Sequence, residues 1–262
     1  MGLIDLFLPE RLPRQVIYAG DRHAETVRLR DGRVADRSRT DGAALADDDG
    51  GDWSGVMASL RAEETGVVFN ADPFIYNFFE FDKLPWQRKA LRELVAWRLQ
   101  KIFPEDIAAY DHRFFVLDRR RVFSILVRRA LLERVEAVFS RQRAPLTCIG
   151  NSTMEILARA RKAKTAPDFF LERDSASCCM VFLSRRAPIY IRKFKSGSAS
   201  DTVEEIGKTV AFVRNQYNIE PRRYWLHDHQ GEGAAVEALL SGGETARLSA
   251  GLGEAPHIPG SR

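Results

Sequence analysis

The sequence offers one pair of side chains with the spacing of metal ligands. His227 and His229 flank Asp228 where a strand-like run ends, and imidazole and carboxylate groups are ligands that zinc uses. A zinc site needs three or four ligands, and no companion Cys or His is near this pair in the sequence. Such a pair is more often a group of surface polar residues, so we expect no metal site.

No pattern of a catalytic nucleophile is present. The sequence lacks the Gly-x-Ser-x-Gly turn that exposes a catalytic serine, and no Ser/His/Asp order is recognisable. The three cysteines, Cys148, Cys178 and Cys179, are odd in number and two are adjacent, which matches neither a disulfide framework nor a metal-ligand spacing. This cysteine usage predicts a protein of the reducing cytoplasm.

Composition narrows the class of protein further. The 262 residues are 45% hydrophobic and 29% charged, which is ordinary for a folded globular chain. The 40 basic and 36 acidic residues give a net charge of +4, and arginine occurs in every segment, so we expect no nucleic-acid partner. No apolar run approaches the ~20 residues that span a bilayer. Met1–Arg14 contains Asp5 and Glu10 and is not expected to be a secretory signal.

The first part of the chain has the pattern of paired strands. Asp31 and Gly32 form the strongest short hairpin signal, between two runs that we expect to pair. Residues 41–52 are small, acidic and turn-rich and are expected to form a flexible surface loop. The expected elements are a helix over Trp53–Glu63 and strands Gln15–Ala19, Thr26–Arg30, Arg33–Thr40 and Gly66–Phe69.

The middle of the chain contains the clearest helical pattern. This helix is expected to begin near Pro85 and to end before Pro104, with Leu91, Leu94 and Val95 at helical spacing. A later helix is expected to begin with a capping box, Ser152-x-x-Glu155. The other expected elements are a helix from Arg129 to about Arg141, an aromatic strand within Pro73–Phe81, strands Tyr110–Leu117, Val122–Val127 and Leu146–Ile149, and a turn over Asp118–Arg121.

The last third repeats the order of the first. A helix is expected to begin with Asp201-x-x-Glu204. In both segments three antiparallel strands precede helix–strand crossovers, which predicts mixed sheets with helices on their faces and therefore an α/β protein. The other expected elements are strands Phe169–Glu172, Ser177–Leu183, Ile189–Phe194 and Arg223–His227 and a helix over Gly233–Leu240.

This doubled order of elements resembles the ribonuclease H-like sheets of the actin-like ATPase superfamily. Residues 79–118 and 121–157 resemble the PilM family of type IV pilus assembly proteins and, equally, the cytoplasmic domain of GspL of type II secretion. Trp97, Leu99 and Lys101 before Pro104 are close to a pattern of these families. The resemblance implies a two-domain actin-like fold over residues 14–164 and 165–262, an N-terminal segment 1–13, and a smaller inserted subdomain between Trp53 and about Ile149.

The resemblance also implies the position of a nucleotide site. Members that bind ATP hold its phosphates between two glycine-rich hairpins, because glycine lets backbone N–H groups approach phosphate oxygens. The first hairpin here retains Gly20 and Asp21, the second has Asp174 and Ser175 but no glycine, and a later loop has Gly231 and Gly233.

We expect this nucleotide site to be degenerate. Glu25, Glu172 and Glu232 would place negative charge near a triphosphate, and like charges disfavour binding. The chain is therefore expected not to be an enzyme and to need no cofactor. The alternatives are a switch that binds ATP with magnesium and a sugar-kinase-like enzyme, for which Asp174 is the available catalytic carboxylate.

Two segments are candidates for partner binding. The N-terminal Leu3, Ile4, Leu6 and Leu8 resemble the Ile-Asn-Leu-Leu-Pro peptide by which PilN-type membrane proteins dock into PilM, although this segment could instead cover the chain's own core. Outward-facing aromatic residues could form a second docking surface. These aromatic residues are Phe74, Tyr76 and Phe78.

The families imply the role and the location of the chain. They predict a cytoplasmic scaffold, peripheral to the inner membrane, that links a membrane partner to a cytoplasmic assembly ATPase. The partner would be the tail of a PilN-like or GspM-like inner-membrane protein, membrane contact would be indirect, and a homodimer is a further expectation.

Overall fold

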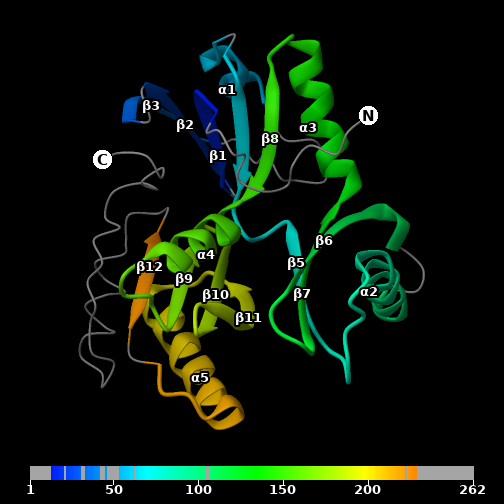
Figure 1. Cartoon of the computed structure of the whole chain (residues 1–262). Coiled ribbons are helices and arrows are strands. Elements are labelled where there is room, and N and C mark those ends of the chain that lie inside the picture. The colour runs from blue at the N-terminus through cyan, green and yellow to red at the C-terminus, as the bar shows by residue number, and fades with distance from the viewer. Residues whose placement is uncertain are drawn as a thin grey trace. The chain divides into compact units, whose positions relative to one another are not determined.

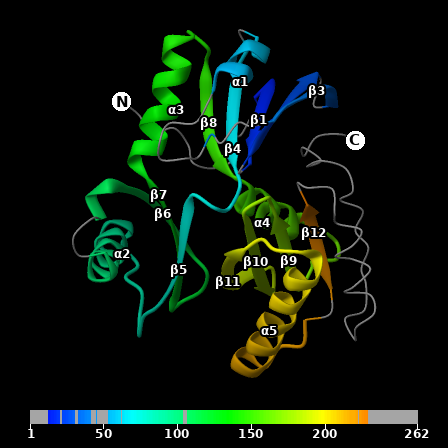
Figure 2. The same ribbon diagram turned by 180° about the vertical axis from the view of Figure 1, so that it is seen from behind.

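The chain contains two compact units. The computed structural model (Figures 1 and 2) describes residues 13–20, 22–30, 33–41, 45, 53–61, 63–103, 107–221 and 223–228. Unit 1 consists of Met1–Asp72 with Val138–Arg262, and unit 2 is Pro73–Ala137. Unit 2 is thus an insertion within unit 1, and it lies inside the range between Trp53 and about Ile149 where an inserted subdomain was predicted. The rest of the predicted domain 14–164 and the predicted domain 165–262 belong to unit 1.

The first sheet of unit 1 has the strand order β3-β2-β1-β4-β8. β1 pairs antiparallel with β2 and parallel with β4, and β4 pairs parallel with β8. Every residue of β1 and β4 is buried, as expected for central strands that are covered on both faces. The strands are β1 Gln15–Ala19, β2 His23–Arg30, β3 Arg33–Asp41, β4 Thr65–Phe69 and β8 Leu146–Asn151.

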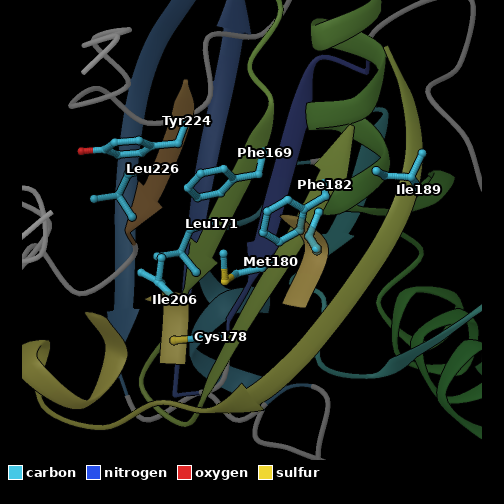
Figure 3. Close-up of a cluster of buried hydrophobic side chains, with 10 residues drawn as sticks. Phe169, Leu171, Cys178, Met180, Phe182, Ile189, Ile206, Tyr224 and Leu226 are labelled. Atoms are coloured by element: carbon cyan, nitrogen blue, oxygen red, sulfur yellow. The ribbon is translucent and has the colours of Figure 1, made fainter. Parts of the chain in front are cut away.

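The second sheet of unit 1 repeats this topology as β11-β10-β9-β12. β9 pairs antiparallel with β10 and parallel with β12, as β1 does with β2 and β4. Helix α5, Ala199–Tyr217, packs Ile206 and Val213 onto a core that includes Phe169, Met180 and Tyr224 (Figure 3). The strands are β9 Phe169–Arg173, β10 Ser177–Ser184, β11 Ala187–Lys195 and β12 Tyr224–Asp228.

Three further helices lie close in the sequence to the strands of the first sheet. Helix α1 contacts β2 and β3, and α4 follows β8 without a loop. Helix α3 crosses the boundary between the two units, and its Phe139 contacts Trp53 edge to face with ring centroids 6.1 Å apart. The helices are α1 Ser54–Ser59, α3 Arg129–Arg141 and α4 Ser152–Lys162.

Unit 2 is a three-stranded antiparallel sheet with one long helix. The strand order is β5-β7-β6, and α2 packs its buried side chains against one face. The buried residues of this core are Phe79, Leu91, Val95, Leu99, Val122 and Leu126. The elements are β5 Phe74–Glu80, α2 Arg88–Ile102, the 3₁₀ turn Ile107–Ala109, β6 Tyr110–Val116 and β7 Arg121–Arg128.

Two predicted helix starts are wrong. The cap of α4 is Asn151, not Ser152, because Asn151 is the last extended residue and its side chain accepts the N–H of Met154. Helix α5 begins earlier than predicted, because Ser198 forms the capping box with Asp201. In each case a polar residue earlier in the chain, outside the helical conformation, accepts a backbone N–H of the first turn.

Other boundaries and turns agree more closely with the sequence. α2 begins at Arg88 rather than near Pro85, and α1 ends at Ser59. The predicted first hairpin is confirmed, since Arg30 pairs with Arg33. The predicted Asp118 turn is confirmed as well, because its carboxylate accepts two backbone N–H groups of the turn.

Several predictions lie outside the described residues. They concern the N-terminal segment, most of the loop 41–52 and the helix over Gly233–Leu240. Within the part of the chain that the structure describes, no helix combines the length and the apolar character needed to cross a bilayer.

Candidate functional site

Polar residues gather where parallel strands of unit 1 end. In the first sheet, Gly20 follows β1, Asn70 follows β4, and β8 ends at Asn151. In the second sheet, Asp174 follows β9 and β12 ends at Asp228. Open α/β sheets bind ligands outside the carboxyl ends of their strands, so this is where a site is expected.

Asp174 is the centre of this group of residues. Its side chain is buried, and each carboxylate oxygen has a donor: Oδ1 accepts the N–H of Ser175 at 2.7 Å and Oδ2 accepts Nδ2 of Asn70 at 3.2 Å. Nδ1 of His23 lies 3.9 Å from Oδ1. Because Asn70 and His23 belong to the first sheet and Asp174 to the second, this carboxylate joins the ends of the two sheets.

Gly20 makes this close approach possible. Its N–H donates to the carbonyl oxygen of His23 at 2.9 Å, which closes the turn between β1 and β2. A Cβ atom on Gly20 would lie 2.6 Å from Oδ2 of Asp174 and 2.9 Å from Cε1 of His23. Real Cβ contacts are essentially never that short, so any larger residue at this position would force the buried Asp174 and His23 side chains to shift.

The backbone N–H groups of the two hairpins already have partners within the chain. Asp174 donates its N–H to the carbonyl oxygen of Ser177 at 2.8 Å, which closes the β9–β10 hairpin. Ser175 donates to the Asp174 carboxylate, and Gly20 donates to His23. An anion that bound these amides would have to displace those acceptors.

Two further buried groups hold the strand ends in place. Asn151 donates from Nδ2 to the carbonyl oxygen of Asn70 at 3.4 Å while its Oδ1 caps α4. Nη1 of Arg173, a fully buried side chain, lies 3.5 Å from Oδ1 of Asp228, and its Nη2 donates to the carbonyl oxygen of Gly197 at 3.2 Å. These contacts tie β12 and the loop before α5 to the second hairpin.

A buried acid–phenol pair lies between β1 and α4. Burial raises the pKa of Glu155, although the guanidinium of Arg159, 2.6 Å away, opposes this shift. Burial also raises the pKa of Tyr18 well above its usual value, and the carboxylate of Glu155, to which Tyr18 donates a hydrogen bond, adds to the effect. The negative charge of Glu172 raises the pKa of Glu155 further, so this region is poorly suited to more negative charge.

The structure brings together part of the predicted nucleotide site. Gly20, Asp174 and Ser175 lie together at the two hairpins, whereas Asp21, Gly231 and Gly233 lie outside the described residues. The sequence analysis did not identify the residues that contact or support Asp174. Each of them begins, ends or immediately follows a strand, and a polar residue at such a position was the signal that could have identified them. The missed residues are His23, Asn70, Asn151 and Arg173.

The predicted partner-binding residues are placed in part. Leu3, Ile4, Leu6 and Leu8 lie outside the described residues. Phe74, Tyr76 and Phe78 alternate along β5 on the sheet face opposite α2, where Tyr76 and Phe78 stack on Phe123. Phe74 is buried and Tyr76 and Phe78 are half-buried, so only the latter two retain exposed surface.

The predicted metal-ligand pair is also placed in part. His227 and Asp228 end β12, and Asp228 pairs with Arg173, whereas His229 is outside the described range. No group of three His, Cys, Asp or Glu side chains with a metal-binding arrangement occurs among the residues that the structure describes.

Solved structures share this fold at low sequence identity. The PilM–PilN type IV pilus biogenesis complex matches with a TM-score of 0.66 and 15% identity over 91% of this chain and 88% of that chain. The cytoplasmic domain of EpsL, an inner-membrane component of the type II secretion system of Vibrio cholerae, matches with a TM-score of 0.57 and 10% identity over 82% of this chain and 81% of that chain. A Bacteroides thetaiotaomicron protein with an actin-like ATPase fold matches with a TM-score of 0.51 and 9% identity over 92% of this chain and 91% of that chain.

These matches define the fold class. The chain has the actin-like ATPase fold, an α/β architecture with mixed sheets flanked by helices, as the sequence predicted. The predicted resemblance to PilM and to the GspL cytoplasmic domain is confirmed at the level of the fold. No protein-family model matches the sequence, and no curated protein matches it.

Proposed function

We propose that the chain is a scaffold of a type IV pilus or type II secretion assembly platform that works without ATP hydrolysis. The single observation that supports the absence of ATP hydrolysis is the position of the Asp174 carboxylate against Gly20. The scaffold role is supported by the structural similarity of most of the chain to PilM in its complex with PilN and to the EpsL cytoplasmic domain.

The residues at the hairpins do not fit a triphosphate. Phosphate oxygens that approached the N–H groups of Gly20 and Ser175 would meet a buried carboxylate that already accepts one of those groups. A phosphate oxygen and the Asp174 carboxylate, both negatively charged and both buried from water, would repel each other strongly. In this proposal the contact between the hairpins occupies the space that a nucleotide would need, and the chain does not hydrolyse ATP.

The proposed role is to link proteins rather than to turn over a substrate. In this role the chain lies in the cytoplasm beside the inner membrane and binds the tail of a PilN-like or GspM-like membrane protein on one side and the assembly ATPase on the other. The similar pilus structure contains PilM together with PilN, which supports a membrane protein as the first partner. A homodimer is a further part of the proposal.

Titration with ATP and magnesium tests the absence of a nucleotide site. A ligand that binds only the folded state raises the melting temperature, and at a hundredfold excess over its Kd it adds about 2.7 kcal/mol of stability. We expect no shift at millimolar ATP. A shift that disappears in Asp174→Ala would instead identify an ATP-binding switch in which Asp174 contacts the nucleotide.

Binding to the membrane partner tests the linking role. We expect the full chain to bind the cytoplasmic tail of a PilN-like or GspM-like protein of the same organism, and to do so equally with and without ATP. Deletion of Met1–Arg11 then tests the N-terminal segment. If this segment takes the place on this chain that the PilN-type peptide takes on PilM, the deletion changes tail binding or the oligomeric state, and an unchanged result for both excludes it from that role.

A further inference from the structure

Unit 2 exposes two tryptophan side chains at its helix. Trp86, immediately before α2, is 91% exposed, and Trp97 within α2 is 48% exposed. Tryptophan is the largest apolar side chain, and both of these rings project into solvent, whereas Trp53 is buried in unit 1. An exposed aromatic ring of this size is unfavourable in water unless a partner covers it.

The same helix carries a concentration of positive charge. Among the described residues, none of its basic side chains forms an ion pair, whereas exposed arginines of the first sheet do, for example Arg37 with Glu25 and Arg39 with Asp41. Glu93 is the single acidic residue of α2. The basic residues of α2 are Arg88, Lys89, Arg92, Arg98 and Lys101.

Helical geometry places part of this charge beside the tryptophan. Trp97 follows the buried Val95 by two positions, which is about 200° around a helix, so it points away from the core. By the same count Lys89 and Lys101 lie within about 90° of Trp97, on opposite sides. Nζ of Lys101 lies 4.0 Å from the centre of the Trp97 ring. The outward face of α2 is therefore an aromatic ridge with a lysine on each side.

We propose that this face of α2, together with Trp86, binds the surface of a bilayer that contains anionic lipids. Tryptophan is favoured at the boundary between headgroups and acyl chains because its ring is apolar and its N–H is polar. Lysine and arginine bind anionic headgroups while their apolar stems cover apolar surface. This contact goes beyond the proposed scaffold role, because it is direct and does not pass through a partner protein.

Charge complementarity selects this occupant over an apolar protein surface. A protein that covered the ridge with apolar residues would bury the ammonium and guanidinium groups of α2 without supplying counter-charges, which is unfavourable. A headgroup layer supplies a plane of phosphates that both flanks of a helix reach at once. Single-stranded nucleic acid also combines phosphates with stacking bases, and it is therefore included as a competing outcome.

Sedimentation of the full chain with lipid vesicles tests the proposal. Vesicles of phosphatidylglycerol with phosphatidylcholine are compared with vesicles of phosphatidylcholine alone, at low and high salt. We expect binding to the anionic vesicles only, a loss of binding at high salt, and a blue shift of tryptophan emission as the exposed rings leave water.

Matched variants assign the contact to α2. One lysine or arginine near an anionic membrane surface strengthens membrane binding by about fivefold. The double variant Lys89→Gln with Lys101→Gln should therefore weaken vesicle binding by about 25-fold. Neutralising two exposed lysines of unit 1, Lys195→Gln with Lys208→Gln, is the charge-matched control and should weaken binding far less.

The aromatic contribution is tested in the same way. Trp86→Ala with Trp97→Ala should weaken vesicle binding at least tenfold and abolish the blue shift, whereas Phe212→Ala with Tyr217→Ala, two exposed aromatic residues of α5, should not. All of these side chains are exposed, so far-ultraviolet circular dichroism should show unchanged folding.

Several results would overturn the lipid contact. They are an absence of binding to the anionic vesicles, equal binding by the α2 variants and their controls, or displacement of the chain from vesicles by single-stranded DNA at equal phosphate concentration. The scaffold proposal is independent of these results, since ATP titration and binding of the partner tail are measured without lipid.

Discussion

The Asp174 carboxylate lies so close to Gly20 that a Cβ atom at residue 20 would be 2.6 Å from Oδ2. We therefore expect Gly20→Ala to destabilise the chain by about 1–3 kcal/mol, because the buried Asp174 and His23 side chains must shift from their present contacts. Gly207→Ala is the matched control. It adds the same methyl group to α5, where no atom beyond the neighbouring backbone of the helix lies within 4 Å, and should stabilise by about 0.5–1 kcal/mol. Urea denaturation measures both changes.

A double-mutant cycle tests whether the Gly20→Ala effect comes from Asp174. In an Asp174→Ala background the obstructing carboxylate is gone, so Gly20→Ala should cost less by at least about 0.5 kcal/mol. Equal costs in the two backgrounds would mean that the hairpins do not meet through this side chain.

The buried Arg173–Asp228 pair should be much more sensitive to mutation than a surface pair. Asp228→Ala leaves the Arg173 guanidinium, 2% exposed, without its carboxylate and should destabilise by about 3–5 kcal/mol. Asp41→Ala removes the carboxylate from the exposed pair with Arg39 and should cost less than about 1 kcal/mol. Similar losses for the two variants, measured by chemical denaturation, would contradict the burial of Arg173.

The pH dependence of stability should reveal Glu155. Burial raises its pKa above the usual 4.5, so the folded state holds the proton more tightly than the unfolded state does. The stability from this group is therefore complete below pH 4.5 and is lost as pH rises through the folded pKa. The stability of the wild type minus that of Glu155→Gln should fall as pH rises from 4.5.

Glu205 is the control of opposite sign. A hydrogen bond from Lys208 lowers the pKa of Glu205, so its contribution is present above pH 4.5 and is lost as pH falls. The stability of the wild type minus that of Glu205→Gln should rise with pH. Denaturation curves at a series of pH values measure both differences, and slopes of the same sign would contradict the assignment for Glu155.

The three cysteines should be unreactive in the native state. All are buried, and burial raises the pKa of Cys178 to about 11 and that of Cys179 further. Since the thiolate is the reactive form, a thiol reagent at pH 8 should modify the native chain slowly and all three residues rapidly after unfolding. Rapid modification of a single thiol in the native protein would show that one of them is accessible.

Local patterns in the sequence were sufficient to predict most elements of the fold. Apolar runs such as Gln15–Ala19 and the Asp31–Gly32 hairpin signal act over a few residues, and the paired strands β1, β2 and β3 formed where they predicted. The helix caps were less predictable. Asn151 and Ser152 both have capping side chains, and the choice depends on which residue keeps an extended backbone after β8 is in place.

The sequence by itself thus determined the order of strands and helices and the doubled α/β pattern, and it showed a glycine at residue 20 in the turn of the first hairpin. Only the tertiary structure decided which polar residues meet, because Asn70 and Asp174 are 104 positions apart and no local propensity acts over that distance. Parallel pairing of β1 with β4 and of β9 with β12 places their carboxyl ends together. The hydrogen bond from Asn70 then joins the end of the first sheet to the Asp174 carboxylate at the end of β9, and this carboxylate lies against Gly20.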